Sequence, residues 1–124
     1  MLSDLINRLN NKPPTILVIG DIMLDKFIFG SVERISPEAP VPIVKLEKEE
    51  QMLGGSGNVI RNLSNLGIKT SLCSAVGKDF AGDLLITQLS KKGTDISNVL
   101  RLKNIRTTEK MRIVADRQQI ARAG

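Results

Sequence analysis

Two short strand patterns separated by a helical pattern constrain the fold of this chain more than any other feature. Residues 15–19 read Thr-Ile-Leu-Val-Ile, and residues 69–76 are expected to form a second buried strand. Continuous β-branched and aliphatic runs of this length are typical of strands buried on both faces. Between them, apolar side chains recur at helical spacing over residues 59–66, and Gly67 follows as a C-terminal cap. This order of elements predicts a parallel α/β sheet with right-handed crossovers.

Two further amphipathic helices are expected. The first precedes Pro13-Pro14, has apolar residues at positions 2, 5, 6 and 9, and offers Ser3 as its N-cap. The second follows Gly77-Lys78-Asp79, carries Phe80 and leucines at 84, 85 and 89, and ends at Gly93. Residues 99–102 form a short extended segment after it.

Residues 26–48 have a different pattern, with short extended segments at 26–29 and 41–46 around a proline-rich bend. Pro42 is compatible only with an edge strand, because proline cannot donate a ladder hydrogen bond. Residues 107–114 alternate as a strand, and residues 118–123 can pair with them across a turn. We therefore expect a small projecting antiparallel β-lid built from residues 26–48 and 107–123.

The composition describes a globular chain of 124 residues, a single domain or part of one, with a formal net charge of +5. All of this excess lies in residues 101–124, which hold seven basic and two acidic residues. A basic end can be a nucleic-acid tail. Because these charges sit in a strand pattern, we favour a solvated strand face with one or two residues that reach an anionic substrate.

Several site chemistries are excluded by the residues present. The chain has no histidine, so it cannot build a Ser-His-Asp triad, a histidine zinc site or a histidine general base. Cys73 is the single cysteine and is interpreted as a small buried hydrophobe. The three Phe residues, without Trp or Tyr, argue against base stacking and so against a nucleic-acid partner. No apolar run approaches the length of a membrane span, and the cytoplasm is the expected compartment.

Three common nucleotide or acyl-transfer motifs also fail. The Gly-x-Gly-x-x-Gly of dinucleotide-binding folds does not follow the first strand. Gly77-Lys78 is followed by Asp79, so it is not a P-loop. Around Ser56, a nucleophile elbow is excluded because Asn58 stands where its last glycine would be.

Asp25 is the first candidate binding residue. It follows the first strand by about five residues, at the edge of the sheet where ligands of open α/β folds bind. A carboxylate there can accept hydrogen bonds from two adjacent hydroxyls, which suits a polyol. The alternative is an aspartate that caps a helix or a turn.

The second candidate is the glycine loop. Gly54-Gly55-Ser56-Gly57 allows close approach of the backbone to a ligand, and the helix that follows offers free N–H groups. Asn58 adds an amide that can both donate to and accept from hydroxyls. The alternative is a flexible turn with an N-cap. The two candidates together favour a polyol site.

Four stretches of the sequence carry a family resemblance. They are Gly-Asp-Ile-Met-Leu-Asp at 20–25, Arg-Ile-Ser-Pro-Glu-Ala-Pro-Val-Pro at 34–42, the glycine loop with Asn58, and Thr107-Thr108-x-Lys110-x-Arg112 with Gln118-Gln119 and Arg122. Over about residues 15–122 the chain resembles the N-terminal half of PfkB/ribokinase-type carbohydrate kinases. Within them it is most similar to the heptose 7-phosphate kinases of lipopolysaccharide-core synthesis.

The resemblance implies a ribokinase-like α/β/α sandwich with a small β-lid that covers the sugar and mediates a homodimer. It implies transfer of the γ-phosphoryl group of ATP, with Mg²⁺, to the anomeric hydroxyl of a heptose 7-phosphate. The residues it places at the substrate are Asp25, Gly54, Gly55 and Asn58 for the sugar, and Lys110 and Arg112 for its phosphate. Solvated strand charges are the alternative for the last two.

The chain also departs from the family pattern. Ser56 and Ile60 replace smaller residues, and Asp116-Arg117 stands where Arg-Asn is usual. The second family signature, which supplies the catalytic base and the anion hole, is absent, and most ATP-binding residues lie outside this chain. We therefore expect a kinase fragment that is inactive alone. A non-catalytic sugar-phosphate-binding or dimerising module and a small basic nucleic-acid-binding protein are the alternatives.

Overall fold

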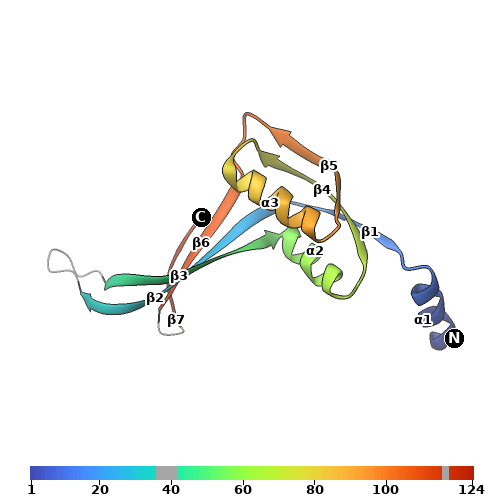
Figure 1. Cartoon of the computed structure of the whole chain (residues 1–124), viewed down its shortest axis with the longest axis horizontal. Coiled ribbons are helices and arrows are strands. Elements are labelled where there is room, and N and C mark those ends of the chain that lie inside the picture. The colour runs from blue at the N-terminus through green and yellow to red at the C-terminus, as the bar shows by residue number, and fades with distance from the viewer. Residues whose placement is uncertain (36–41, 116–117) are drawn as a thin grey trace. The chain divides into compact units, whose positions relative to one another are not determined.

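The structure is a computed structural model that describes residues 1–35, 42–115 and 118–124. It divides into two units, which we call the α/β unit (residues 1–23 and 53–107) and the β unit (residues 24–52 and 108–124). Most of the Arg-Ile-Ser-Pro-Glu-Ala-Pro-Val-Pro stretch and the Asp116-Arg117 pair lie outside the described residues. Figure 1 labels the elements in chain order.

A three-stranded parallel sheet forms the centre of the α/β unit. Its order is β1 (Thr15–Ile19), β4 (Lys69–Gly77) and β5 (Asp95–Leu102). The register places Ile19 opposite Cys73 in the first pair of strands and Ala75 opposite Leu100 in the second. Helices α2 (Ser56–Asn65) and α3 (Phe80–Lys91) connect the strands. The predicted parallel α/β sheet is confirmed, and β5 is longer than the short segment expected at 99–102.

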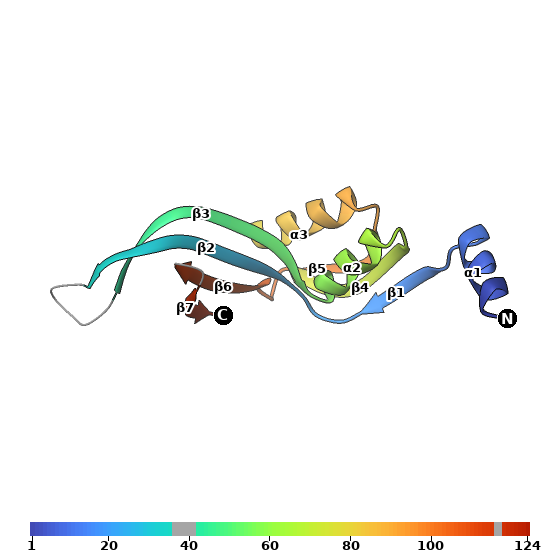
Figure 2. The same ribbon diagram turned by 90° about the horizontal axis from the view of Figure 1, so that it is seen from below.

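The core of this unit lies between the sheet and the two helices. Helices α2 and α3 lie on the same face of the sheet (Figure 2). The fully buried side chains of this unit include Ile60, Leu72, Val76, Leu85 and Leu89. Gly67 and Gly93 have positive φ angles just beyond the two helices, as expected of C-terminal caps.

The opposite face of the sheet carries exposed apolar side chains. Ile19 is 73% exposed and Leu100 is 59% exposed, and Leu17 is also exposed. The prediction that residues 15–19 are buried on both faces is therefore wrong. The reason is that β1 is an edge strand and both packed helices lie on one side, so alternate residues of β1 point away from them.

Helix α1 (Leu2–Asn11) ends before Pro13-Pro14, as predicted, but none of its residues is buried. Its apolar face, which includes Leu5 and Leu9, is exposed. The Ser3 cap was a wrong prediction, because Ser3 lies inside the helix and Met1 is the N-cap.

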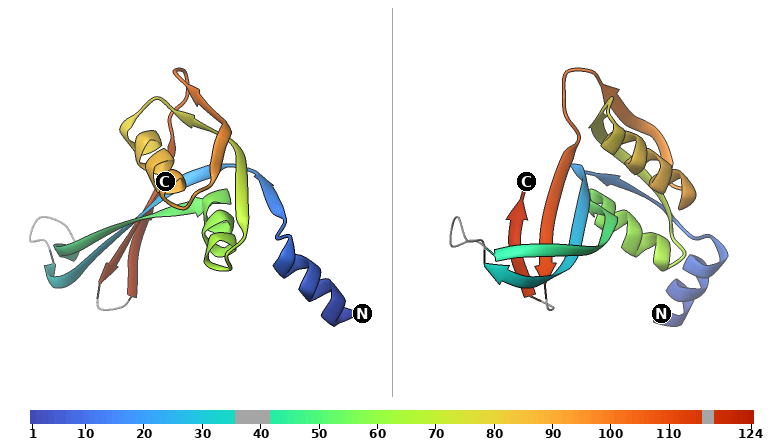
Figure 3. Two further views of the ribbon diagram at one scale, coloured as in Figure 1. Left: turned by 45° about the vertical axis from the view of Figure 1, so that its right-hand side comes forward. Right: turned by 60° about the vertical axis from the view of Figure 1, so that its left-hand side comes forward.

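The β unit is a four-stranded sheet in the order β3, β2, β6, β7. The strands are β2 (Ile22–Ile35), β3 (Pro42–Gly55), β6 (Thr108–Ala115) and β7 (Gln118–Ala123). β6 and β7 pair antiparallel (Figure 3), as predicted. Their register places Arg112 opposite Arg122. Pro42 begins β3, an edge strand, which agrees with the edge-strand prediction.

Candidate functional site

Asp25 lies inside strand β2, so the turn and helix-cap alternatives for it are wrong. Its side chain is 19% exposed. One carboxylate oxygen, Oδ2, is 3.6 Å from an Nη1 atom of Arg112, which is an ion pair but too long for a hydrogen bond. The other, Oδ1, is buried and has no hydrogen-bond partner among the described residues. Asp25 thus has one oxygen beside a cation and one that can accept from a ligand.

Arg112, on β6, is 23% exposed and lies between two groups. Its guanidinium carbon is 5.3 Å from the centre of the Phe27 ring, which is a cation–π distance. The guanidinium is therefore held by the ring and by Asp25, rather than moving freely in solvent.

Strand periodicity places the other charges of β6. Lys110 and Arg112 are two residues apart, so both belong to one face of the strand. Glu109 belongs to the other face, where its carboxylate is 2.8 Å from the ammonium of Lys26. A shallow pocket lined by Lys26 and Glu109, among others, lies on that second face. The Asp25–Arg112 pair and the Lys26–Glu109 pair are thus on opposite faces.

Gly54 and Gly55 end β3, and the reason for Gly55 is visible in the backbone. Gly55 has φ +59° and ψ −129°, a conformation open to glycine alone. A Cβ atom there would collide with the carbonyl oxygen of Asp21. The observed close approach is to the protein's own backbone, and approach to a ligand stays a prediction.

Asn58 is the third residue of α2 and is exposed. Its Oδ1 accepts a hydrogen bond from the guanidinium of Arg61, one turn further along. Asn58 is therefore not an N-cap. The N-cap position is Gly55, and no side chain caps the helix. The N–H of Ser56, the first residue of the helix, donates to the Asp21 carbonyl at 2.9 Å.

The six predicted residues form two groups, one in each unit. Asp25 is brought next to Arg112, with Lys110 on the same strand face, in the β unit. Gly54, Gly55 and Asn58 lie together at the β3–α2 junction in the α/β unit.

Phe27 and Arg61 were missed by the sequence reasoning. Phe27 was detectable, because it stands two residues after Asp25 and so shares its strand face. Arg61 could have been found in the same way, because it stands three residues after Asn58 on a helix.

The family model described as pfkB family carbohydrate kinase matches residues 14–123. The chain belongs to the pfkB family. Among curated relatives of this pfkB chain, bifunctional protein HldE of Citrifermentans bemidjiense is 46% identical over 106 residues, covering 86% of this chain and 22% of that protein. HldE of Helicobacter pylori strain J99 is 49% identical over 107 residues, covering 86% of this chain and 23% of that protein. The chain therefore spans less than a quarter of the length of these relatives.

Solved structures show the fold of the pfkB chain. A carbohydrate kinase from Agrobacterium tumefaciens superposes with a TM-score of 0.70 at 23% identity, over 88% of this chain and 34% of that one. Arabidopsis thaliana ribokinase complexed with ribose and ATP gives 0.69 at 18% identity, over 90% and 35%. The predicted ribokinase-like α/β fold is confirmed. In the described residues, packed helices cover only one face of the parallel sheet.

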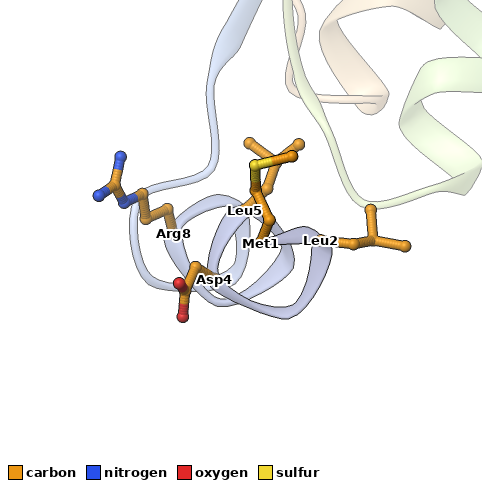
Figure 4. Close-up of a pocket in the computed structure, with 5 residues that line it drawn as sticks. All are labelled: Met1, Leu2, Asp4, Leu5 and Arg8. Atoms are coloured by element: carbon orange, nitrogen blue, oxygen red, sulfur yellow. The ribbon is translucent and has the colours of Figure 1, made fainter.

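Other features of the pfkB chain do not add to these groups. A pocket on α1 is lined by Met1, Leu2, Asp4, Leu5 and Arg8, and none of the six predicted residues lines it (Figure 4). Within residues 1–35, 42–115 and 118–124, no cluster of three His, Cys, Asp or Glu side chains could hold a metal ion. In the same part of the chain, no helix is long and apolar enough to cross a membrane.

Proposed function

We propose that this chain is the sugar-phosphate-binding part of a kinase that phosphorylates the anomeric hydroxyl of D-glycero-β-D-manno-heptose 7-phosphate. Membership of the pfkB family and the HldE relatives support a carbohydrate kinase. The observation that carries the proposal is the buried Oδ1 atom of Asp25, which has no hydrogen-bond partner in the described part of the chain.

A buried acceptor without a partner is costly, by about 1–3 kcal/mol and more when it is charged. A ligand hydroxyl that donates to Oδ1 of Asp25 would remove this cost. Such a bond to a carboxylate is worth about 1.5–3 kcal/mol. Sugars offer hydroxyl donors at adjacent carbons, so Asp25 suits a sugar better than an acceptor-only anion.

Arg112 and Lys110 support an anionic group on the same ligand. The Arg112 guanidinium has several N–H donors in one plane, and its position over Phe27 leaves donors at its edge for a phosphate. Its partial burial favours this role over that of a solvated strand charge. Arg101, also in the basic end, is already bound to Asp83 and to the Gly77 carbonyl, which leaves it less free for a nucleic acid.

Phosphoryl transfer depends mainly on positioning and on charge neutralisation. In the proposed reaction, bound ATP would supply the phosphoryl group and Mg²⁺ would supply neutralisation of its charge. The described residues hold no metal cluster, so none of them is assigned to Mg²⁺, and none is assigned to ATP or to the catalytic base. Asp25 would orient the sugar, and Arg112 would hold its phosphate.

The proposal is tested by calorimetric titration of the chain with heptose 7-phosphate. We expect binding to the wild type and at least about tenfold weaker binding to Asp25→Asn, which turns an acceptor into a donor and removes the charge. The matched control is Glu109→Gln, on the other face of the β unit, which should bind as the wild type does. Equal weakening in both variants, or no binding to the wild type, would contradict the proposal.

A further inference from the structure

Both carboxylate oxygens of Asp79 accept hydrogen bonds from the protein. Its Oδ1 accepts from the N–H of Gly82 at 2.8 Å and from the hydroxyl of Thr107 at 2.6 Å. Its Oδ2 accepts from the N–H of Thr107 at 2.9 Å. Asp79 therefore caps α3 and at the same time accepts from both the N–H and the hydroxyl of Thr107, 28 positions later in the chain.

Asp79, Gly82 and Thr107 form a hydrogen-bonded cluster, and Thr107 joins this cluster to the central strand. Its buried hydroxyl accepts from the N–H of Gly77, at the end of β4, at a distance of 2.9 Å. These hydrogen bonds can form only because positions 77 and 82 are glycines and carry no side chain. A Cβ atom at Gly77 would lie 2.6 Å from Asp79 and from Ile105, and one at Gly82 would collide with the Gly77 carbonyl oxygen.

The cluster stands where the chain leaves one unit for the other. Thr107 is the last residue of the α/β unit, and β6 begins at Thr108. Two other strands, β2 and β3, also cross between the units, and the side-chain hydrogen bonds near these crossings join neutral groups. The N–H of Ile22 donates to the hydroxyl of Ser74, and the hydroxyl of Ser56 donates to the Gly20 carbonyl, both bonds being neutral. Only the Thr107 end is tied to a carboxylate in the described residues.

The register of β6 decides which of its side chains meet Asp25. Side chains alternate along a strand, so a slip by one residue moves each of them to the other face. In the observed register, Arg112 faces Asp25, and Glu109 faces Lys26 on the opposite side. A one-residue slip would exchange these faces and separate both pairs.

We propose that Asp79 and Thr107 form an anchor that fixes the register in which β6 enters its sheet, and so hold Arg112 opposite Asp25. Both are positioning residues, since neither contacts Asp25 or Arg112 in the described structure. The inference concerns the unliganded protein and does not depend on which ligand Asp25 binds.

The experiment replaces Thr107 in the chain of 124 residues and follows β6 by nuclear magnetic resonance. Thr107→Val keeps the shape of the side chain and removes the hydroxyl. The matched control is Thr94→Val, which removes another buried hydroxyl, bonded to that of Thr70 at 2.9 Å, in the same unit. Both variants should lower the melting temperature, so stability alone does not distinguish an anchor from ordinary packing.

An anchor is distinguished from ordinary packing by the register of β6 and by the protection of its amide hydrogens from exchange. In Thr107→Val we expect loss of the wild-type cross-strand Overhauser effects between β2 and β6, with at least about tenfold faster amide exchange in residues 108–115. In Thr94→Val, the Overhauser effects and the exchange rates of β6 should stay as in the wild type. Thr107→Ser keeps the hydroxyl and should also behave as the wild type does in both measurements. If Thr107→Val does not fold, Asp79→Asn is the second variant, because an amide retains one acceptor for Gly82. The proposal would be overturned if a folded Thr107→Val variant kept the wild-type Overhauser effects between β2 and β6, or if the Thr94→Val control lost them to the same extent. It would also be overturned if the amides of β6 exchanged as fast as unfolded ones in the wild type.

Discussion

Asp25 and Asp79 carry the same side chain in opposite hydrogen-bonding states. Both oxygens of Asp79 accept from protein donors, three bonds in all, so its charge is already satisfied within the fold. Asp25 has one oxygen near a cation and one buried oxygen that none of the described residues bonds. A carboxylate that the fold satisfies completely stabilises the fold, whereas one left incomplete can gain from a ligand. This contrast separates a structural aspartate from a candidate binding one.

The Asp79 cluster predicts a specific dependence of stability on pH. The Thr107 hydroxyl, followed by the Thr107 N–H, holds the pKa of Asp79 below its ordinary value of 3.8, although burial acts in the opposite direction. Because the folded pKa is the lower one, the stabilisation is complete above pH 3.8 and is lost as the pH falls through the folded pKa.

Asp79→Asn should therefore cost about 1–3 kcal/mol of unfolding free energy at neutral pH, and this difference from the wild type should shrink below pH 3.8. Urea unfolding at several pH values measures it. Thr94→Val, which removes no carboxylate, should differ from the wild type by a constant amount. A difference for Asp79→Asn that is equally constant in acid would show that the charge of Asp79 contributes nothing.

At the residue scale, the sequence pointed to candidate binding residues but could not show which groups surround them. The residue types of Asp25 and of the glycine loop suit a polyol. The structure adds the contacts that these residues make, which residue types alone cannot show. The Asp25 oxygen that has no partner within the described ranges, and the position of Arg112 beside Asp25, both depend on pairing between distant strands. The Asp79–Thr107 bonds join residues 28 positions apart, so no local pattern could reveal them.

At the element scale, local patterns predicted the type of each element and erred on length and burial. β2 and β3 have 14 residues each, where the sequence indicated short segments. Gly30 and the charged run at 45–50 look like interruptions, but an edge strand tolerates exposed charges, and Gly30 lets the Lys45 carbonyl approach its backbone closely. Burial of a strand depends on what covers it, which residues 15–19 alone could not show.

The β3–α2 junction gives the prediction for this scale. Gly55→Ala would force a side chain into a glycine-only conformation and against the Asp21 carbonyl, so it should cost more than about 2 kcal/mol of unfolding free energy. The matched control is Gly67→Ala. Gly67 also has a positive φ of 78°, but a Cβ atom there meets nothing within 4 Å, so strain alone should cost about 1 kcal/mol. Urea unfolding of both variants checks this order. Equal losses would mean that the contact with Asp21 relaxes freely.

At the scale of the whole molecule, the described structure leaves a large amount of apolar surface exposed. One face of the parallel sheet presents Leu17, Ile19 and Leu100, which the register places on the same side. Apolar patches on a sheet face favour association, because each contact removes apolar area from water.

We therefore expect the chain to self-associate, with sedimentation coefficients that rise with protein concentration. Ile19→Lys/Leu100→Lys places two charges on the exposed sheet face and should weaken association by at least about tenfold, because each contact would then bury a charge. The matched control is Leu66→Lys/Phe80→Lys, which adds the same charge at two helix positions that are each 75% exposed. If the two double variants weaken association equally, net charge rather than the sheet face is responsible. A wild-type chain that sediments as a monomer at every concentration would show that this face does not drive association.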